Sequence, residues 1–370
     1  MEKYLPWFVL KNVPGIGDIL YKRLIETFNT PENVFNAPED QLKKIKKIST
    51  RTIQAIQHPK ALDKAEKELK TIKNSGFKLI SMNDDAYPAL LKEIPDPPPL
   101  LTYLGNLDNT APAIAIVGSR RATRYGVDAA FKLSYELSLA GFQIVSGMAE
   151  GIDTAAHRGA ISAKQRTLAV LGSGLARIYP RTNRHLFEEI IKTGAVISEF
   201  SINTGPDAIN FPKRNRIISG ISTGTIVVEA AARSGSLITA RLAGEQSREV
   251  FAVPGSIHSE KSSGTHTLLK QGAKLVENKT DVIEELHHLV HLEPFMPGKQ
   301  SAKPARPAIP RNDPYKNAIL RILDPYPMHI DKIIEKSGLD PGGISAALLD
   351  MEIQGIVKQD PGKLFYIIEE

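Results

Sequence analysis

The chain has 370 residues and contains no cysteine, which excludes disulfide bonds, thiolate metal sites and a cysteine nucleophile. Hydrophobic residues make up 42% of the chain and charged residues 24%, so it can bury a normal core, and no apolar run approaches the ~18–20 residues of a membrane span. The net charge of +6 divides into +5 for residues 1–75, +4 for residues 76–315 and −3 for residues 316–370, so the first two regions suit a polyanion. Because the first residues lack a charged-then-apolar leader, we expect a cytoplasmic protein without a membrane segment.

Residues 1–75 are predicted to form short helices without a strand. Within them, Val13-Pro14-Gly15-Ile16-Gly17 is typical of the turn in a helix-hairpin-helix unit, where glycines let the backbone approach a phosphate and the next helix offers its positive N-terminus. A tight turn in a small helical packing module explains the same residues equally well.

Residues 76–112 are rich in proline and turn residues, and residues 113–290 alternate short apolar strands with amphipathic helices. This alternation is typical of a parallel α/β sheet. Residues 293–314 are proline-rich and predicted to be a linker, and residues 315–370 form a last small helical unit that ends in a strand. The predicted domains are therefore 1–75, 76–292 and 315–370. The predicted strands are 114–117, 143–145, 167–171, 195–199, 225–229 and 249–253.

Glycines cluster directly after several of these strands, as in Gly118, Gly147, Gly172 and Gly255. Ligands of open α/β sheets bind outside the carboxyl ends of the strands, and glycines there leave room for an anion to meet backbone N–H groups. A Walker A loop is absent, and no strand is followed by the complete glycine pattern of a dinucleotide site. We therefore predict phosphate binding without ATP hydrolysis and without NAD.

The segment Phe211-Pro212-Lys213-Arg214-Asn215-Arg216 places three cations close to a proline. If the proline is the first residue of a helix, these cations lie in its first turn, where the helix dipole disfavours positive charge, so we expect an anion beside them. Arg120, Arg121 and Arg181 are predicted to converge on the same rim. The alternative is an internal ion-pair network with Glu150, Asp153, Glu199 or Glu229.

Catalytic patterns are weak in comparison. The chain has no G-x-S-x-G nucleophile elbow and no H-E-x-x-H zinc motif. Asp153 and His157, which are four residues apart, are explained more simply by a helix cap and a surface contact than by acid–base catalysis. We predict no catalytic residue, no metal site and no cofactor.

Taken together, these residues resemble the DNA-processing protein A family, also called DprA or Smf, over essentially the whole chain. Each motif alone is weak, and their joint order is specific. The motifs are Asp85 to Leu90, Pro97 to Leu101, Val117 to Arg120, Ser146 to Asp153, Tyr179 to Asn183, Phe211 to Arg216 and Ser234 to Ala240.

The resemblance implies an extended Rossmann-like α/β domain that binds single-stranded DNA, preceded by a helical module of sterile-alpha-motif type and followed by a winged helix. It further implies a homodimer that protects incoming DNA and helps to load the RecA recombinase during natural transformation, without enzymatic activity. The candidate DNA-binding residues are Gly118, Ser119, Arg120, Arg121, Arg181, Asn183, Lys213, Arg214, Asn215 and Arg216.

In the expected winged helix, residues 329–337 form the second helix, residues 342–354 the third, and residues 360–363 lie near the wing. The third helix is apolar and acidic, which does not suit reading of a DNA groove. A protein-contacting or autoregulatory role and a merely stabilising one both remain open.

The alternative function is that of a nucleotide-binding hydrolase of the lysine-decarboxylase-like group, which has a similar Rossmann variant and carries a P-G-G-x-G-T-x-x-E motif. The comparable run, Ser219 to Thr225, lacks the glycine pair, and Glu229 is displaced by one residue. A third possibility is an adaptor whose α/β domain binds nothing.

Overall fold

The computed structural model describes residues 2–59, 62–108, 110–288, 313–323 and 327–367. The chain forms two compact units, one of residues 1–121 and 129–295 and the other of residues 122–128 and 296–370. Within the described residues, no helix combines the length and apolar character needed to cross a bilayer.

The first unit is built on a nine-stranded sheet with the order β1-β2-β6-β5-β4-β3-β7-β8-β9. Along the sheet, β6, β5, β4, β3, β7, β8 and β9 are parallel to one another. At one edge β1 pairs antiparallel with β2, and β2 pairs antiparallel with β6. The central strands are buried on both faces, as expected for a parallel sheet between helices. The strands are β1 (Lys78–Ser81), β2 (Leu100–Gly105), β3 (Ala113–Val117), β4 (Gln143–Ser146), β5 (Thr167–Val170), β6 (Ala195–Ser198), β7 (Gly224–Val227), β8 (Glu249–Ala252) and β9 (Lys274–Leu275).

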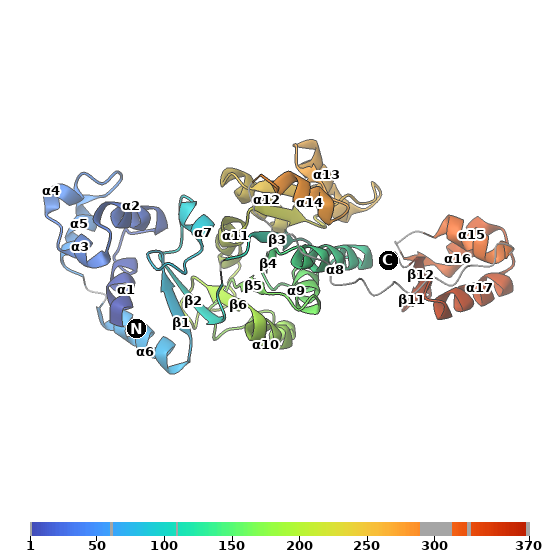
Figure 1. Ribbon diagram of the computed structural model, residues 1–370, viewed down its shortest axis with the longest axis horizontal. Helices are drawn as coiled ribbons and strands as arrows, with labels where there is room; N and C mark the ends of the chain where they lie inside the picture. Colours follow the sequence, from blue (N-terminus) through green and yellow to red (C-terminus); the bar gives the residue numbers. More distant parts are fainter. Residues whose placement is uncertain (1, 60–61, 109, 289–312, 324–326, 368–370) are drawn as a thin grey trace. The chain divides into compact units, whose positions relative to one another are not determined.

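Helices cover both sides of this sheet (Figure 1). Helices α9 and α10 pack on β3 to β6. Helix α11 contacts β3, β4 and β5, and α12 packs on β7 and β8. The helices are α7 (Ala89–Glu93), α8 (Arg124–Leu139), α9 (Ile152–Ser162), α10 (Arg184–Thr193), α11 (Asn210–Ile221), α12 (Gly235–Glu245), α13 (Ser263–Lys270) and α14 (Lys279–Leu286), with short 3-10 turns at Arg181–Asn183 and Glu260–Ser262.

All six predicted strands are present within about two residues of their expected limits, which confirms the α/β class. The antiparallel strands β1 and β2 were not predicted, because they lie in the proline-rich segment that was expected to form turns. The two-residue β9 was also missed, since it is too short to show a pattern.

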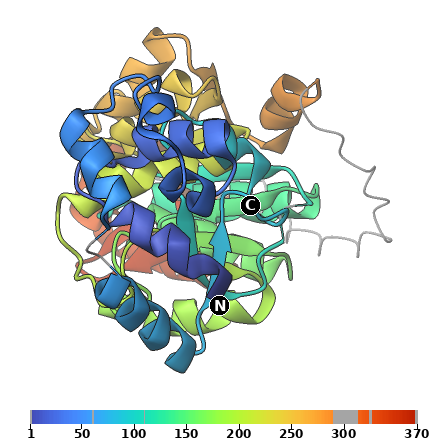
Figure 2. The same cartoon turned by 90° about the vertical axis from the view of Figure 1, so that its left-hand side faces the viewer.

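The N-terminal residues form the expected short helices, and residues 2–59 and 62–77 contain no strand. Figure 2 shows the first unit from the side on which they lie. Leu10 and Leu24 of these helices belong to the same apolar core as Ile217 and Ile218 of α11, so this part packs on the α/β domain. This shared core does not test the predicted domain limits at residues 75 and 292, which remain predictions. The elements are a 3-10 turn (Glu2–Tyr4), α1 (Leu5–Lys11), α2 (Asp18–Phe28), α3 (Pro31–Phe35), α4 (Glu39–Leu42), α5 (Thr50–Gln57) and α6 (Leu62–Asn74).

The second unit has its own apolar core and the three-stranded sheet β10-β12-β11, which confirms the predicted winged helix. The second and third helices begin and end within one residue of the predicted limits, and the wing turns at Gly362 and Lys363. Most of the predicted linker, residues 293–312, lies outside the described residues. The elements are α15 (Pro314–Ile322), β10 (Met328–His329), α16 (Ile330–Ser337), α17 (Pro341–Ile353), β11 (Val357–Asp360) and β12 (Leu364–Ile367).

Candidate functional site

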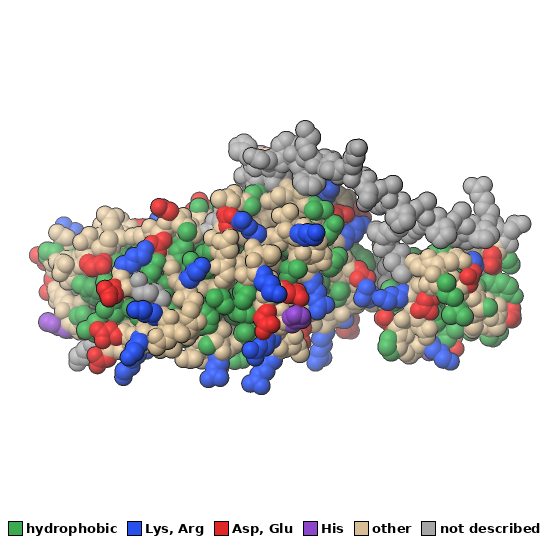
Figure 3. Space-filling view, turned by 60° about the horizontal axis from the view of Figure 1, so that its bottom comes forward, with side chains coloured by type: hydrophobic (Ala, Val, Ile, Leu, Met, Phe, Trp, Pro, Cys, Tyr) green, Lys and Arg blue, Asp and Glu red, His purple; other side chains and the backbone are tan. Residues whose placement is uncertain are grey.

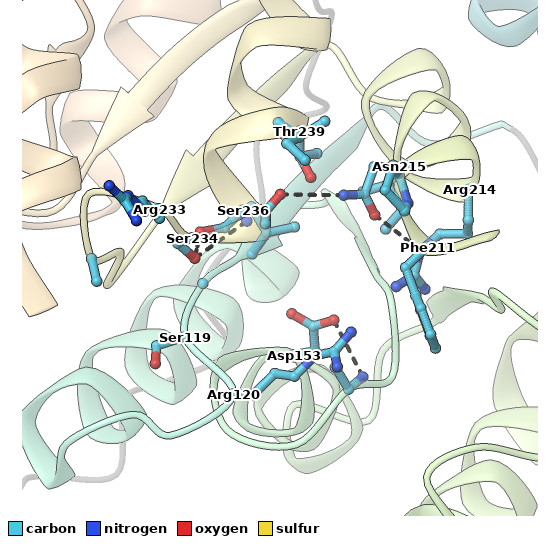
Figure 4. Close-up of a pocket in the computed structure, with 18 residues that line it drawn as sticks. Ser119, Arg120, Asp153, Phe211, Arg214, Asn215, Arg233, Ser234, Ser236 and Thr239 are labelled. Carbon is cyan, nitrogen blue, oxygen red and sulfur yellow. Dashed lines mark hydrogen bonds between the residues drawn. The ribbon is translucent and has the colours of Figure 1, made fainter. Parts of the chain in front are cut away.

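The strand order reverses between β3 and β7. The chain runs from β3 through β4 and β5 to β6 on one side and from β7 through β8 to β9 on the other, so the loops after β3 and β7 diverge. Such a switch point leaves a crevice at the carboxyl ends of the strands. A cavity of about 410 Å³ opens there, between these two loops and the start of α11 (Figure 4).

Five of the predicted site residues line this cavity: Gly118, Ser119, Arg120, Arg214 and Asn215. The loop after β3 is held in place because the N–H of Ile152, at the start of α9, donates to the carbonyl of Ser119 at 3.2 Å. One wall of the cavity is formed by residues that were not predicted as site residues. They follow β7 and are Arg233, Ser234, Ser236 and Thr239. The strand-end rule applied to this loop would have indicated them.

Arg120 is an exposed cation that lies over an aromatic ring. Its guanidinium carbon is 4.9 Å from the ring centre of Phe211. The ring of Phe211 is in turn 5.8 Å from that of Tyr179, which is 42% exposed. Arg120, Phe211 and Tyr179 are thus in consecutive contact, with the two ring planes tilted by 52° to each other, and we call these three side chains the stacking column. The column joins the cavity to a small recess beside Tyr179.

Arg214 points into the protein and is only 4% exposed. Its Nη1 donates to the carbonyl of Gly147 at 2.7 Å and to that of Val170, and its Nε donates to Asn215 Oδ1 at 3.2 Å. Burial lowers the pKa of Arg214 to about 10, and nearby Asp153 acts in the opposite direction. Arg214 therefore ties together the ends of β4 and β5, and it presents little of its charge to a ligand.

Glycines make room for α11 at both of these strand ends. A Cβ on Gly147 would lie 2.4 Å from the Arg214 guanidinium, and one on Gly172 would lie 2.7 Å from the ring of Phe211. The expectation that strand-end glycines leave room for an anion is wrong at these two positions, because side chains of α11 fill the space.

Asp153 and His157 are both buried, so the predicted surface contact is wrong. Asp153 Oδ2 accepts the N–H groups of Gly147 at 3.1 Å and Ala149 at 3.2 Å, which shapes the loop after β4. Burial raises the pKa of Asp153. His157 Nδ1 lies 2.7 Å from Thr167 Oγ1, and burial, assisted by Arg214, lowers the pKa of His157 to about 3.

Arg216 does not reach the cavity. It is 6% exposed and pairs with Asp18 at 3.0 Å, with Asp96 at 3.4 Å and with Glu199. This is the internal ion-pair network that the sequence left open as an alternative, with Glu199 as its expected member. The helix begins at Asn210, two residues before Pro212, so Arg214 and Arg216 lie beyond its first four residues and the dipole argument does not apply to them.

The other predicted residues lie outside the cavity lining. Arg121, Arg181 and Lys213 are exposed, and they form no ion pair with the described residues. Asn183 is buried and its Nδ2 donates to the carbonyl of Met148 at 2.9 Å and to Thr154 Oγ1 at 2.8 Å, so it supports the loop after β4. Figure 3 shows Lys and Arg side chains gathered over the middle of one face of the first unit.

In the part of the chain that the structure describes, no cluster of His, Asp or Glu could hold a metal ion. The site combines the hydroxyl groups of Ser234, Ser236 and Thr239, the exposed guanidinium groups of Arg120 and Arg233, and the stacking column. Such a set can bind an anion through charge and a planar ring through stacking.

Comparison with known proteins gives a consistent result. The family model described as DNA recombination-mediator protein A matches residues 78–287, and that of the DprA winged helix domain matches residues 303–363. The chain is 35% identical to Protein Smf of Synechocystis sp. over 384 residues, covering 96% of both chains. It is 42% identical to DNA processing protein DprA of Bacillus subtilis over 236 residues, covering 63% of this chain and 80% of that one.

Two solved structures are also similar. The X-ray structure of DNA processing protein A from Streptococcus pneumoniae superposes with a TM-score of 0.66 at 38% identity, covering 75% of this chain and 96% of that one. A structure that describes the single-stranded DNA binding mode of DNA processing protein A from Helicobacter pylori gives a TM-score of 0.53 at 30% identity, covering 58% of this chain and 97% of that one.

Proposed function

The chain belongs to the DprA/Smf family of DNA recombination mediators, and from this premise we propose that it binds single-stranded DNA at the cavity between β3 and β7. Family membership confirms the resemblance stated from the sequence. The family consists of recombination mediators rather than enzymes, so the hydrolase alternative is not retained.

The stacking column carries the proposal. Unpaired bases stack on aromatic rings and on guanidinium planes, and each stacked base contributes ~1–3 kcal/mol. Tyr179 offers an exposed ring, and Arg120 places a charge on the same column. In a duplex both faces of each base are already covered by neighbouring bases, so the column favours a single strand. A cavity of about 410 Å³ is in the range of small-ligand sites and holds one or a few nucleotides.

Phosphate contacts supply the rest of the affinity. Arg120 and Arg233 line the cavity, and Arg121, Arg181 and Lys213 are exposed cations of the same unit without an ion-pair partner among the described residues. We propose that they follow the backbone of the bound strand. Arg214, Arg216 and Asn183 act in this proposal as supports for the site, because their polar groups are already engaged inside the protein.

The protein partners are proposed on a different basis. Loading of the RecA recombinase onto incoming strands during natural transformation rests on the family alone, and it implies a cytosolic location. For the homodimer we propose the edge of the sheet at β9, where Leu275 is 48% exposed. An edge strand with an exposed apolar side chain offers unpaired backbone groups and an apolar contact to a second copy.

Filter binding of equal-length single and double strands at two ionic strengths tests the DNA proposal. We expect the single strand to bind more tightly and its affinity to fall steeply with salt, because bound counterions are released on binding. Equal affinity for duplex and single strand, together with unchanged binding by Arg120→Ala, would contradict the proposed site.

A further inference from the structure

A second cavity, of about 480 Å³, lies in the N-terminal helices. Its walls are the α1–α2 hairpin, one face of α5 and the start of α6. We call it the hairpin groove. The residues that matter for the argument are Val13, Pro14, Arg51, Gln54, His58 and Lys64.

The hairpin glycine builds this groove by packing. Gly15 has a φ of +89°, and a Cβ on it would lie 2.4 Å from Thr52 Oγ1 of α5. Only glycine allows the hairpin to approach α5 so closely. Thr52, Ile53 and Ile56 hold α5 on the core, so its opposite face is free to line the groove. The lining positions 51, 54, 55 and 58 have the i, i+3, i+4, i+7 spacing of one helical face.

The groove is cationic and has no carboxylate in its lining. Arg51 and Lys64 are exposed, and neither forms an ion pair with a described residue. Two lysines of these helices are paired, since Lys22 lies 3.8 Å from Glu26 and Lys43 lies 2.8 Å from Glu39. Lys70 and Lys73 of α6 form no ion pair with a described residue either, so what distinguishes Arg51 and Lys64 is that both line the same hollow. Because Arg51 and Lys64 line the same hollow, an anion bound there would meet two cations.

We propose that the hairpin groove binds the sugar–phosphate backbone of DNA, as a contact separate from the cavity between β3 and β7. This rests on the proposed function only in that the chain binds DNA. The guanidinium of Arg51 and the ammonium of Lys64 engage phosphate oxygens, and the amide of Gln54 donates to them. Val13, Pro14 and Ala55 provide an apolar floor for the sugars. No Phe, Tyr or Trp lines the groove and His58 is its single ring, so we expect no platform for successive bases and no sequence preference.

The test compares two double variants with the same change in charge. Arg51→Ala/Lys64→Ala removes the cations of the groove. Lys70→Ala/Lys73→Ala removes two exposed cations of α6 that lie about 9 and 14 Å along the helix from Lys64, at ~1.5 Å per residue. Binding of a 40-nucleotide single strand is measured across a salt series for both variants and for Arg51→Lys/Lys64→Arg.

We expect the groove variant to bind about tenfold more weakly at low salt and to lower the salt slope by about 1.4, because two phosphate contacts are lost. The Lys70/Lys73 variant and the charge-preserving variant should retain the original slope. Equal losses in the two alanine variants, or no loss in either, would overturn the proposal, since the groove would then contribute no more than general charge.

The same measurement in an Arg120→Ala background separates this proposal from the proposed function. If both sites bind, the groove substitutions reduce the residual affinity by the same factor as in the natural chain. If Arg120→Ala changes nothing and the groove variant abolishes binding, the cavity proposal fails and the groove proposal stands. If Arg120→Ala abolishes binding and the groove variant is unchanged, the groove proposal fails alone.

Discussion

The guanidinium of Arg214 occupies the space that a side chain on Gly147 would need. The nearest guanidinium nitrogen is 2.4 Å from the position of a Cβ on Gly147, and Arg214 also donates to the carbonyl of that glycine. Two motifs separated by more than sixty residues in sequence are therefore one contact in the structure.

Gly147→Ala should displace Arg214 and leave the carbonyl of Val170 without its donor. We expect the free energy of unfolding to fall by ~2–4 kcal/mol, since overpacking and a lost buried hydrogen bond act together. Urea unfolding measures it. Gly205→Ala is the control, because a Cβ there has no atom within 4 Å, and it should change stability by less than ~0.5 kcal/mol. Similar unfolding midpoints for the two variants would show that Arg214 adapts without cost.

Arg120→Ala should weaken binding of single-stranded DNA by about ten- to hundredfold and lower the salt slope by about one, because a charge on the stacking column is lost. Arg121→Ala removes the same charge from the next residue, which does not line the cavity, and we expect a smaller loss. A gel-shift series in increasing salt gives both values. Equal losses of affinity for the two variants would assign the effect to net charge rather than to the stacking column.

Tyr179→Ala should reduce affinity for a single strand by about 5- to 150-fold, which corresponds to the ~1–3 kcal/mol of one stacked base. Tyr179→Phe retains the ring and should bind as the natural chain does. Fluorescence anisotropy with a short labelled oligonucleotide distinguishes these cases. If both variants lose affinity equally, the hydroxyl rather than the ring contacts the DNA.

Arg216→Ala should destabilise the protein by ~3–5 kcal/mol, because it leaves the carboxylates of Asp18, Asp96 and Glu199 without their cation. The salt slope of DNA binding should stay unchanged, since Arg216 is buried. Lys213→Ala, on the exposed side of the same helix, should show the opposite behaviour, with normal stability and a lower slope. Thermal unfolding and gel shifts in increasing salt on both variants test this contrast. A reduced salt slope for Arg216→Ala would mean that Arg216 contacts the DNA.

His157 should make stability sensitive to acid. Its pKa is about 3 in the folded protein, against an ordinary value of about 6.5, so the unfolded chain binds the proton first as the pH falls. Above pH ~6.5 His157 is neutral in both states and does not affect the free energy of unfolding. Below this pH the unfolded chain is stabilised by its proton, so the free energy of unfolding falls by about 1.4 kcal/mol per pH unit. Burial raises the pKa of Asp153 and Glu199, and these groups act in the opposite direction.

The test is therefore a difference between two chains. We compare urea unfolding of the natural chain and of His157→Gln at pH 7 and pH 5. The advantage of the natural chain should shrink by about 2 kcal/mol between these pH values. A constant difference would mean that His157 takes up its proton in the folded state as readily as in the unfolded chain.

The strands and their glycine-rich ends could be predicted because buried parallel strands are short, apolar and bounded by turn residues. This located the cavity and identified Arg120. The directions of Arg214 and Arg216 could not be predicted, because they depend on where α11 begins. The helix starts at Asn210 rather than Pro212, and Phe211 packs against Gly172, a contact between distant residues that local sequence does not reveal. Arg233 was missed because it is a single cation in the loop after β7, so no cluster of charge marked it, although the strand-end rule would have indicated it.

Arg214 and Arg216 stand two positions apart on α11, which is about 200° around the helix axis. Arg214 donates to the backbone at the strand ends beneath the cavity, and Arg216 pairs with Asp18 in the helices that precede the sheet. An inserted or deleted residue between Asn210 and Arg214 would turn both side chains by about 100° and break both attachments together. Length changes in this stretch should therefore be selected against during evolution more strongly than any single replacement.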